Sequence, residues 1–99
     1  GLLAHLDTAN EAPGENVKIR MIENYQGGEI NYPANPSVKL DYESAPKLKE
    51  CIGHTVITSD GTTLLGGDDK AGLAVLTELV HYYKKNPDKP HGKVRIAVI

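Results

Sequence analysis

The chain has one cysteine, no long run of apolar residues and no excess of basic charge, and each absence excludes a class of protein. Cys51 has no partner for an internal disulfide and belongs to no C-x-x-C motif, which favours a reducing cytosol as the compartment. The apolar runs extend over only a few residues, so we expect neither a transmembrane helix nor the core of a signal peptide. A formal net charge of −2 gives no reason to expect nucleic acid or a membrane as partner.

Common motifs for phosphate and calcium are missing as well. The stretch GGDDKAG lacks the G-x-x-x-x-G-K-[ST] spacing of a P-loop, and the chain has no G-x-G-x-x-G. Acidic residues at a helix start would also repel a phosphate. The stretch DGTTLLGGDD does not provide the alternating oxygen ligands of an EF-hand loop.

Both ends of the chain read as apolar strands without flanking turns. The 99 residues, of which 39% are hydrophobic, are enough for a modest core, but the sequence opens on GLLAHLD and stops on GKVRIAVI. A free-standing domain seldom begins and ends inside its own core. We therefore expect an internal piece of a longer enzyme or a proteolytic fragment.

The first 65 residues predict short strands and turns. Leu2–Leu6 is the first expected strand, and the alternation in VKIRMI indicates a second, half-exposed strand. Residues 26–44 are interrupted by glycine and proline and can hold only short strands or turns, whereas residues 45–53 can form one or two helical turns. Two β-rich runs on either side of Asp60-Gly61 predict a hairpin.

A helix is predicted after the pair Asp68 and Asp69. Apolar residues recur at three- and four-residue spacing and widen into a broad stripe, and Pro87 prevents the helix from continuing. The following VRIAVI is apolar on both faces, which is typical of a strand buried between helix layers. This order predicts a βαβ crossover and an α/β layered fold.

Three residues could form a metal site. His5 and Asp7 are two positions apart at the carboxyl end of the first strand, where they would share one side of it and where open α/β sheets collect ligands. A carboxylate beside one nitrogen of an imidazole fixes the tautomer that binds a metal, and Asp68 could be a second ligand or a bridge between two metals. On spacing alone, a solvated strand end and an ordinary acidic helix start remain the simpler interpretation.

Four segments, taken together in their order and approximate spacing, favour the metal site over the simpler interpretation. AHLDT, ENYQGGEI, TSDGTTLLGGDDKAG and PHGKVRIAVI together resemble the peptidase T family. Its members are tripeptide aminopeptidases of the co-catalytic zinc exopeptidases, a superfamily that also includes carboxypeptidase G and the aminoacylases. The motifs H-x-D and D-D-K-x-G resemble the superfamily as a whole, whereas N-Y-x-G-G and L-L-G-x-D-D-K-A-G resemble the peptidase T branch.

The resemblance implies roles for individual residues. His5 is expected to ligate one of two zinc ions, Asp68 to bridge both ions, and Asp7 to be the catalytic carboxylate that orients and polarises His5. It also implies a cis peptide bond after Asp68. For Asp69 and Lys70 the simpler interpretation is favoured, in which Asp69 caps the helix and Lys70 is solvated or pairs with Asp69.

The resemblance further implies a three-layer αβα catalytic domain, of which residues 1–99 are the N-terminal part, truncated at both ends. The Glu general base, the remaining ligands and the smaller lid and dimerisation domain are not in this sequence. We therefore expect a cytoplasmic, zinc-dependent aminopeptidase that cleaves short peptides with metal-activated water, and an isolated fragment that is inactive without the remainder of its own polypeptide. The alternatives are another hydrolase of the superfamily, such as a dipeptidase or an aminoacylase, and a catalytically dead scaffold protein.

Overall fold

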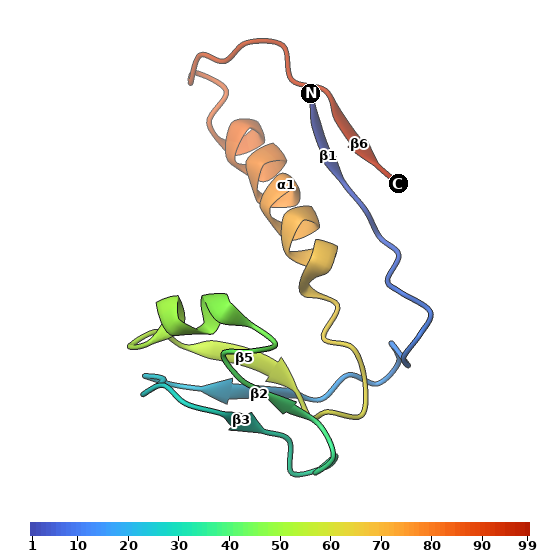
Figure 1. The fold of residues 1–99 in the computed structure, drawn as a ribbon. Helices are drawn as coiled ribbons and strands as arrows, with labels where there is room; N and C mark the ends of the chain where they lie inside the picture. Colours follow the sequence, from blue (N-terminus) through green and yellow to red (C-terminus); the bar gives the residue numbers. More distant parts are fainter. The chain divides into compact units, whose positions relative to one another are not determined.

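The computed structural model describes all residues from Gly1 to Ile99, and they form two compact units. Unit 1 consists of Gly1–Ala9 and Gly66–Ile99, and unit 2 consists of Asn10–Leu65. The elements, labelled in Figure 1, are β1 (Leu2–Ala4), β2 (Ile19–Ile22), β3 (Ile30–Asn31), β4 (Lys39–Leu40), the 3-10 helix η1 (Pro46–Cys51), β5 (Val56–Ser59), α1 (Gly67–Lys85) and β6 (Ile96–Val98). The chain is thus α/β, with short strands and one α-helix, and no helix has the length and apolar character needed to cross a membrane.

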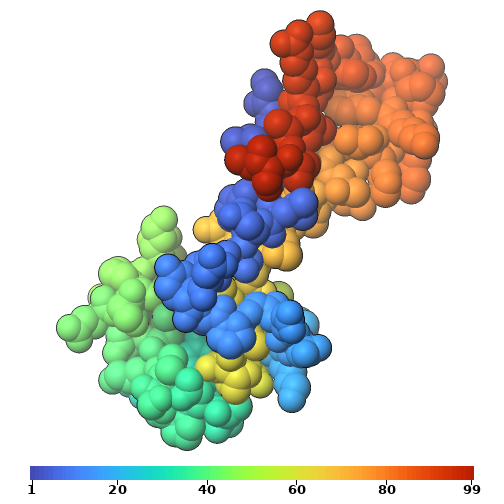
Figure 2. All heavy atoms as spheres, turned by 90° about the vertical axis from the view of Figure 1, so that its right-hand side faces the viewer, coloured from blue at the N-terminus to red at the C-terminus, as the bar shows by residue number.

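Unit 1 is built on a parallel strand pair. β1 and β6 pair in parallel, with Leu2 opposite Ile96 and Ala4 opposite Val98. Figure 2 shows the atoms of β6, in red, against those of β1, in blue. Because α1 precedes β6 and contacts β1, the unit contains the predicted βαβ crossover, with unit 2 inserted in the sequence before the helix.

Helix α1 follows its predicted course but buries less than expected. It ends at Lys85, and the backbone N–H of Asn86 donates to the Tyr82 carbonyl at 3.0 Å before Pro87. No α1 residue is fully buried, and all three residues of β6 are exposed. The prediction that β6 is buried between two helix layers is wrong for these residues. A single helix can cover at most one face of the two-stranded sheet.

Unit 2 contains two antiparallel strand pairs and a small core. β2 pairs with β5, and β3 pairs with β4. Tyr25, Ile30 and Leu48 are the buried core residues, and Ile22 of β2 packs against them. β2 is half-exposed, as predicted, but the apolar residues of the predicted alternation lie on its open face, since Ile19 and Met21 are 63% and 59% exposed.

The hairpin predicted across Asp60-Gly61 is wrong. β5 pairs with β2, which is distant in sequence, and no strand follows Gly61 before α1. The reason lies in local hydrogen bonds: the Asp60 carboxylate accepts from the backbone N–H of Thr62 at 2.9 Å, and the Ser59 hydroxyl donates to the Thr63 carbonyl at 2.8 Å. These short-range bonds bend the chain back on itself, so residues 62 and 63 are not available to pair with β5.

The N-Y-x-G-G segment is a turn held by two tyrosines. The hydroxyl of Tyr25 donates to the Gly28 carbonyl, and the Gly28 N–H donates to the hydroxyl of Tyr42 at 2.8 Å. Burial, together with the hydrogen bond to Tyr42, raises the pKa of Tyr25 to about 12. Gly27 has φ +94°, and a Cβ there would lie 2.9 Å from the Tyr42 hydroxyl oxygen. The segment therefore needs glycine at position 27 for both backbone and steric reasons.

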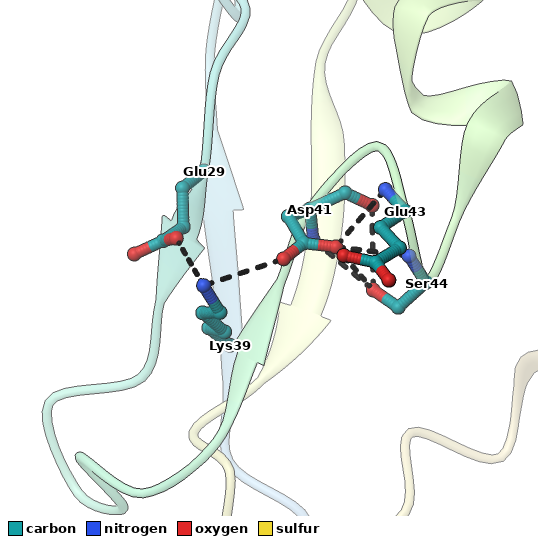
Figure 3. A network of polar contacts seen from close by, with 5 residues as sticks. All are labelled: Glu29, Lys39, Asp41, Glu43 and Ser44. Carbon is teal, nitrogen blue, oxygen red and sulfur yellow. Dashed lines mark hydrogen bonds and ion pairs between the residues drawn. The ribbon is translucent and has the colours of Figure 1, made fainter.

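A charged network joins β3 and β4 in unit 2 (Figure 3). Lys39 Nζ lies between Glu29 Oε2, at 3.0 Å, and Asp41 Oδ2, at 3.4 Å. The other oxygen of Asp41 accepts from the backbone N–H groups of Glu43, at 3.1 Å, and Ser44, at 2.9 Å. The bonds from Ser44, and then Lys39, hold the pKa of Asp41 below its ordinary value.

Candidate functional site

The candidate site begins where β1 ends. The strand stops at Ala4 and not at the predicted Leu6, so His5 and Asp7 lie on the segment just beyond its carboxyl end. The hydrogen bonds to the last residue of the chain nevertheless continue, since the Leu6 N–H donates to the Ile99 carbonyl at 2.7 Å. This pairing holds the backbone between the two predicted site residues.

His5 and Asp7 contact each other through one ring nitrogen. His5 Nδ1 lies 2.9 Å from the Asp7 carbonyl oxygen and 3.3 Å from Asp7 Oδ1. A carbonyl oxygen can only accept, so Nδ1 carries a hydrogen in this arrangement. The Asp7 contact therefore leaves the other nitrogen, Nε2, as the one available to a ligand.

Asp68 approaches that second nitrogen from the start of α1. Its Oδ1 lies 3.0 Å from His5 Nε2, although the two residues are 63 positions apart in sequence. Its backbone is not helical (φ −94°, ψ 105°), and the peptide bond to Asp69 is cis, as the resemblance implies. The side chain of Asp68 is 95% exposed and that of His5 39%, so both are accessible to solvent and to a ligand.

The electrostatics of His5 follow from these contacts. The hydrogen bond to the Asp7 carbonyl and then the bond to Asp68 raise the pKa of His5 above its ordinary value. Two acceptors therefore face the two ring nitrogens and favour positive charge at this position. A site that attracts a proton in this way can also attract a metal cation, which competes with the proton for Nε2.

Asp69 lies beside the site but has a different partner. Its Oδ1 accepts from the backbone N–H of Gly72 at 3.2 Å. Because Asp68 and Asp69 have non-helical dihedral angles, the regular part of α1 begins after Asp69, and this bond satisfies one of the free N–H groups of its first turn. The bond agrees with the predicted capping role.

Lys70 has a partner that was not predicted. It forms no ion pair with Asp69; its Nζ donates to the backbone carbonyl of Leu6 at 3.0 Å. The sequence contains no signal for this bond, because the acceptor is a backbone atom 64 residues away. Lys70 is exposed, as the solvated alternative predicts, but the pair with Asp69 is not formed.

The structure thus brings His5, Asp7 and Asp68 together. Among its 99 residues, no group of three or more His, Cys, Asp and Glu side chains is arranged to hold a metal ion. Two other histidines of unit 1 have separate surroundings: His81 lies 3.8 Å from Glu78, and the His91 ring packs on Tyr83 with their centroids 4.3 Å apart. These contacts agree with surface or structural roles for both histidines.

Comparison with known proteins gives relatives over nearly the whole chain. No family model matches it. Proteins named peptidase T from Bacillus pumilus, an Exiguobacterium species and Bacillus thuringiensis are 47%, 46% and 50% identical to it over 97 residues. Each match covers 98% of this chain and 24% of the relative, so the chain spans about a quarter of the length of these curated relatives.

These relatives carry the name of a peptidase, and the chain is similar to one segment of each of them. More particularly, it is homologous to one quarter of peptidase T. The resemblance carried by the four sequence segments is therefore confirmed at the level of the family.

Proposed function

We propose that the complete polypeptide is a zinc-dependent aminopeptidase that removes the N-terminal residue from short peptides, with tripeptides as the preferred class. In this proposal residues 1–99 are part of a three-layer αβα catalytic domain in the cytoplasm and supply one portion of a two-zinc site. The observation that carries the proposal is the 3.0 Å approach of His5 Nε2 to Asp68 Oδ1, with Asp7 on the other ring nitrogen. The names of the relatives support the peptidase class.

The donor set fits part of a zinc site. Imidazole nitrogen and carboxylate oxygen are both common zinc ligands, and the two ligand atoms here face each other from different elements. Asp7 accepts from Nδ1, which is the usual arrangement around a metal-binding histidine. Because His5 and Asp68 are only two ligands, the remaining ones must come from outside these residues.

Each of the three residues has a chemical task in this proposal. Asp7 keeps the proton on Nδ1 and so keeps the Nε2 lone pair available. Asp68 adds negative charge next to Nε2, and its exposed carboxylate has a second oxygen that can accept from the opposite side. When bound, a pair of zinc ions would polarise the scissile carbonyl and lower the pKa of a water molecule. The side chains of this chain contribute by holding the cations and fixing the histidine tautomer.

The test uses the complete polypeptide that carries this chain. Metal content is measured before and after treatment with a chelator. Hydrolysis of a tripeptide, a dipeptide and an N-acyl amino acid is measured under the same two conditions. We expect two zinc ions per chain, a preference for the tripeptide, and activity that is lost with the metal and restored by zinc. Preference for the dipeptide or the acyl amino acid would favour another hydrolase of the superfamily, and a folded protein with neither zinc nor activity would favour a scaffold.

A further inference from the structure

Lys70 is the residue near the candidate site whose contact is not accounted for by the proposed function. Its Nζ donates to the carbonyl of Leu6, the residue between His5 and Asp7. Lys70 itself is two positions after Asp68, so this one hydrogen bond connects the two segments that carry the candidate ligands. We propose that Lys70 is a positioning residue, which holds the end of β1 against the start of α1 and thereby keeps His5 and Asp68 within reach of one cation.

Leu6 is held on both sides of its backbone. Its N–H donates to the Ile99 carbonyl at 2.7 Å, and its carbonyl accepts from Lys70 at 3.0 Å. The first bond ties the segment to the end of the chain after β6, and the second ties it to α1. Without Lys70, the Leu6 carbonyl would lose its protein partner, and the adjoining His5 and Asp7 would be free to rotate with it.

Helix stability does not explain a lysine at this position. A positive charge in the first turn of a helix is unfavourable because it faces the positive end of the helix dipole. Lys70 also forms no ion pair with either neighbouring aspartate, so local charge compensation is not its role. The long-range bond to Leu6 is the one contact that accounts for its orientation.

Two glycines shape the turn around Lys70. A Cβ built on Gly66, which has φ +81°, would lie 3.8 Å from Lys70 Nζ and 3.9 Å from Lys70 Cδ, so the side chain extends over this residue. A Cβ built on Gly72 would collide with the Asp69 carboxylate that caps the helix. Both glycines therefore leave room for the contacts that fix the direction of the first turn, from which Lys70 reaches Leu6.

The inference rests on the proposed metal site, and its first test is independent of metal. In the complete polypeptide, Lys70→Met removes the donor, Lys70→Arg keeps a donor, and Lys84→Met is the matched control at an exposed position of the same helix. Hydrogen exchange of the segment that contains the Leu6 amide is measured by mass spectrometry on metal-free protein. We expect faster exchange in Lys70→Met than in Lys84→Met, and protection close to wild type in Lys70→Arg. Equal exchange in the two methionine variants would overturn the tether.

The second test measures the effect on metal binding. Zinc affinity is determined by competition with a chromophoric chelator, and the cobalt-substituted protein is compared by its visible absorption spectrum. We expect Lys70→Met to weaken zinc binding by roughly 10- to 100-fold, the range for loss of an outer-shell partner, and to alter the cobalt spectrum. Lys84→Met should match wild type, and Lys70→Arg should recover most of the affinity.

The outcomes separate this inference from the proposed function. Changed exchange with unchanged zinc affinity would overturn the positioning role, and an arginine variant as weak as the methionine variant would overturn the assigned hydrogen bond. If wild-type protein binds no zinc, the proposed function fails, while the exchange experiment still decides whether Lys70 holds Leu6.

Discussion

Asp68 and Asp69 are adjacent in sequence, but their partners differ, so their replacement should have different consequences. Asp68 Oδ1 faces His5 Nε2 at 3.0 Å, whereas Asp69 Oδ1 accepts from the Gly72 N–H at 3.2 Å. We expect Asp68→Ala in the complete polypeptide to abolish peptide hydrolysis and lower zinc content with little loss of stability, because its exposed side chain makes no capping bond. Asp69→Ala should retain the metal and lose stability.

The magnitude for Asp69 follows from the cap. Loss of an N-cap acceptor costs about 0.5 to 2 kcal/mol. A distance of 3.2 Å is at the long end for an N–H donor, so we expect the lower half of that range. For a domain of about 150 to 250 residues this corresponds to a decrease in Tm of roughly 1 to 5 °C. Asp69→Asn keeps an acceptor oxygen and should be close to wild type.

The assays are zinc stoichiometry, thermal unfolding in the presence of a chelator, and hydrolysis of a tripeptide, applied to all three variants. The chelator ensures that the change in Tm reports the cap and not the metal. If Asp69→Ala loses its zinc and Asp68→Ala retains it, the two roles are reversed. If neither variant affects zinc content, the pair is only a helix start and the metal site assigned to this turn is refuted.

Three further predictions concern single contacts. Asp7→Asn keeps the backbone carbonyl that accepts from His5 Nδ1 but removes the carboxylate charge 3.3 Å from that nitrogen, and it should weaken zinc affinity or activity by roughly 10- to 100-fold in a folded protein; unchanged kinetics and zinc titration would show that the carboxylate has no role at the site. Gly27→Ala should destabilise the protein more than Gly28→Ala, since both residues have positive φ but only at position 27 would a Cβ meet the Tyr42 hydroxyl oxygen, at 2.9 Å; equal changes in Tm would contradict this. Asp41 has a lowered pKa in the folded protein, so its contribution to stability is present above its unfolded pKa and is lost as pH falls through the folded value. An NMR titration of its carboxyl carbon that gives an ordinary pKa would contradict the prediction.

The elements that depend on local rules could be predicted from the sequence. Helix α1 has its apolar spacing, its acidic start and Pro87 beyond its end, and the structure ends it at Lys85. The short strands at residues 30–31 and 39–40 agree with the turn-rich composition of that region. The chain also bends at the Asp60-Gly61 pair, but strand pairing is not a local property: β5 pairs with β2, and the Ser59 hydroxyl donates to the Thr63 carbonyl across the bend.

Burial was harder to predict than secondary structure, because burial depends on what packs against an element. The apolar character of VRIAVI predicts a buried strand, yet all of β6 is exposed in these 99 residues. The apolar residues Ile19 and Met21 on one face of β2 are exposed for the same reason: no other part of unit 2 covers that face. The pattern of apolar residues indicates which face of a strand can be buried. The element that packs against the strand determines whether that face is buried.

The candidate site shows the same division between local and long-range information. The H-x-D spacing identified the contact between His5 and Asp7, although β1 ends before both residues and the contact is made by the segment after the strand. The approach of Asp68 could be expected only from the crossover and the family resemblance, since no spacing rule relates positions 5 and 68. The bond from Lys70 to the Leu6 carbonyl could not be predicted, because its acceptor is present at every residue of every sequence.

The exposure of the site indicates what holds it together. The side chains of Asp7 and Asp68 are 86% and 95% exposed, so solvent screens their attraction for His5, and that attraction contributes little to folding. The distance between His5 and Asp68 must instead be set by the backbone segments that carry them. Those segments are fixed by the pairing of β1 with β6 and by Lys70. A variant that breaks one of these contacts should therefore disturb the site without removing a ligand, whereas a variant of Asp68 should remove a ligand without disturbing the fold.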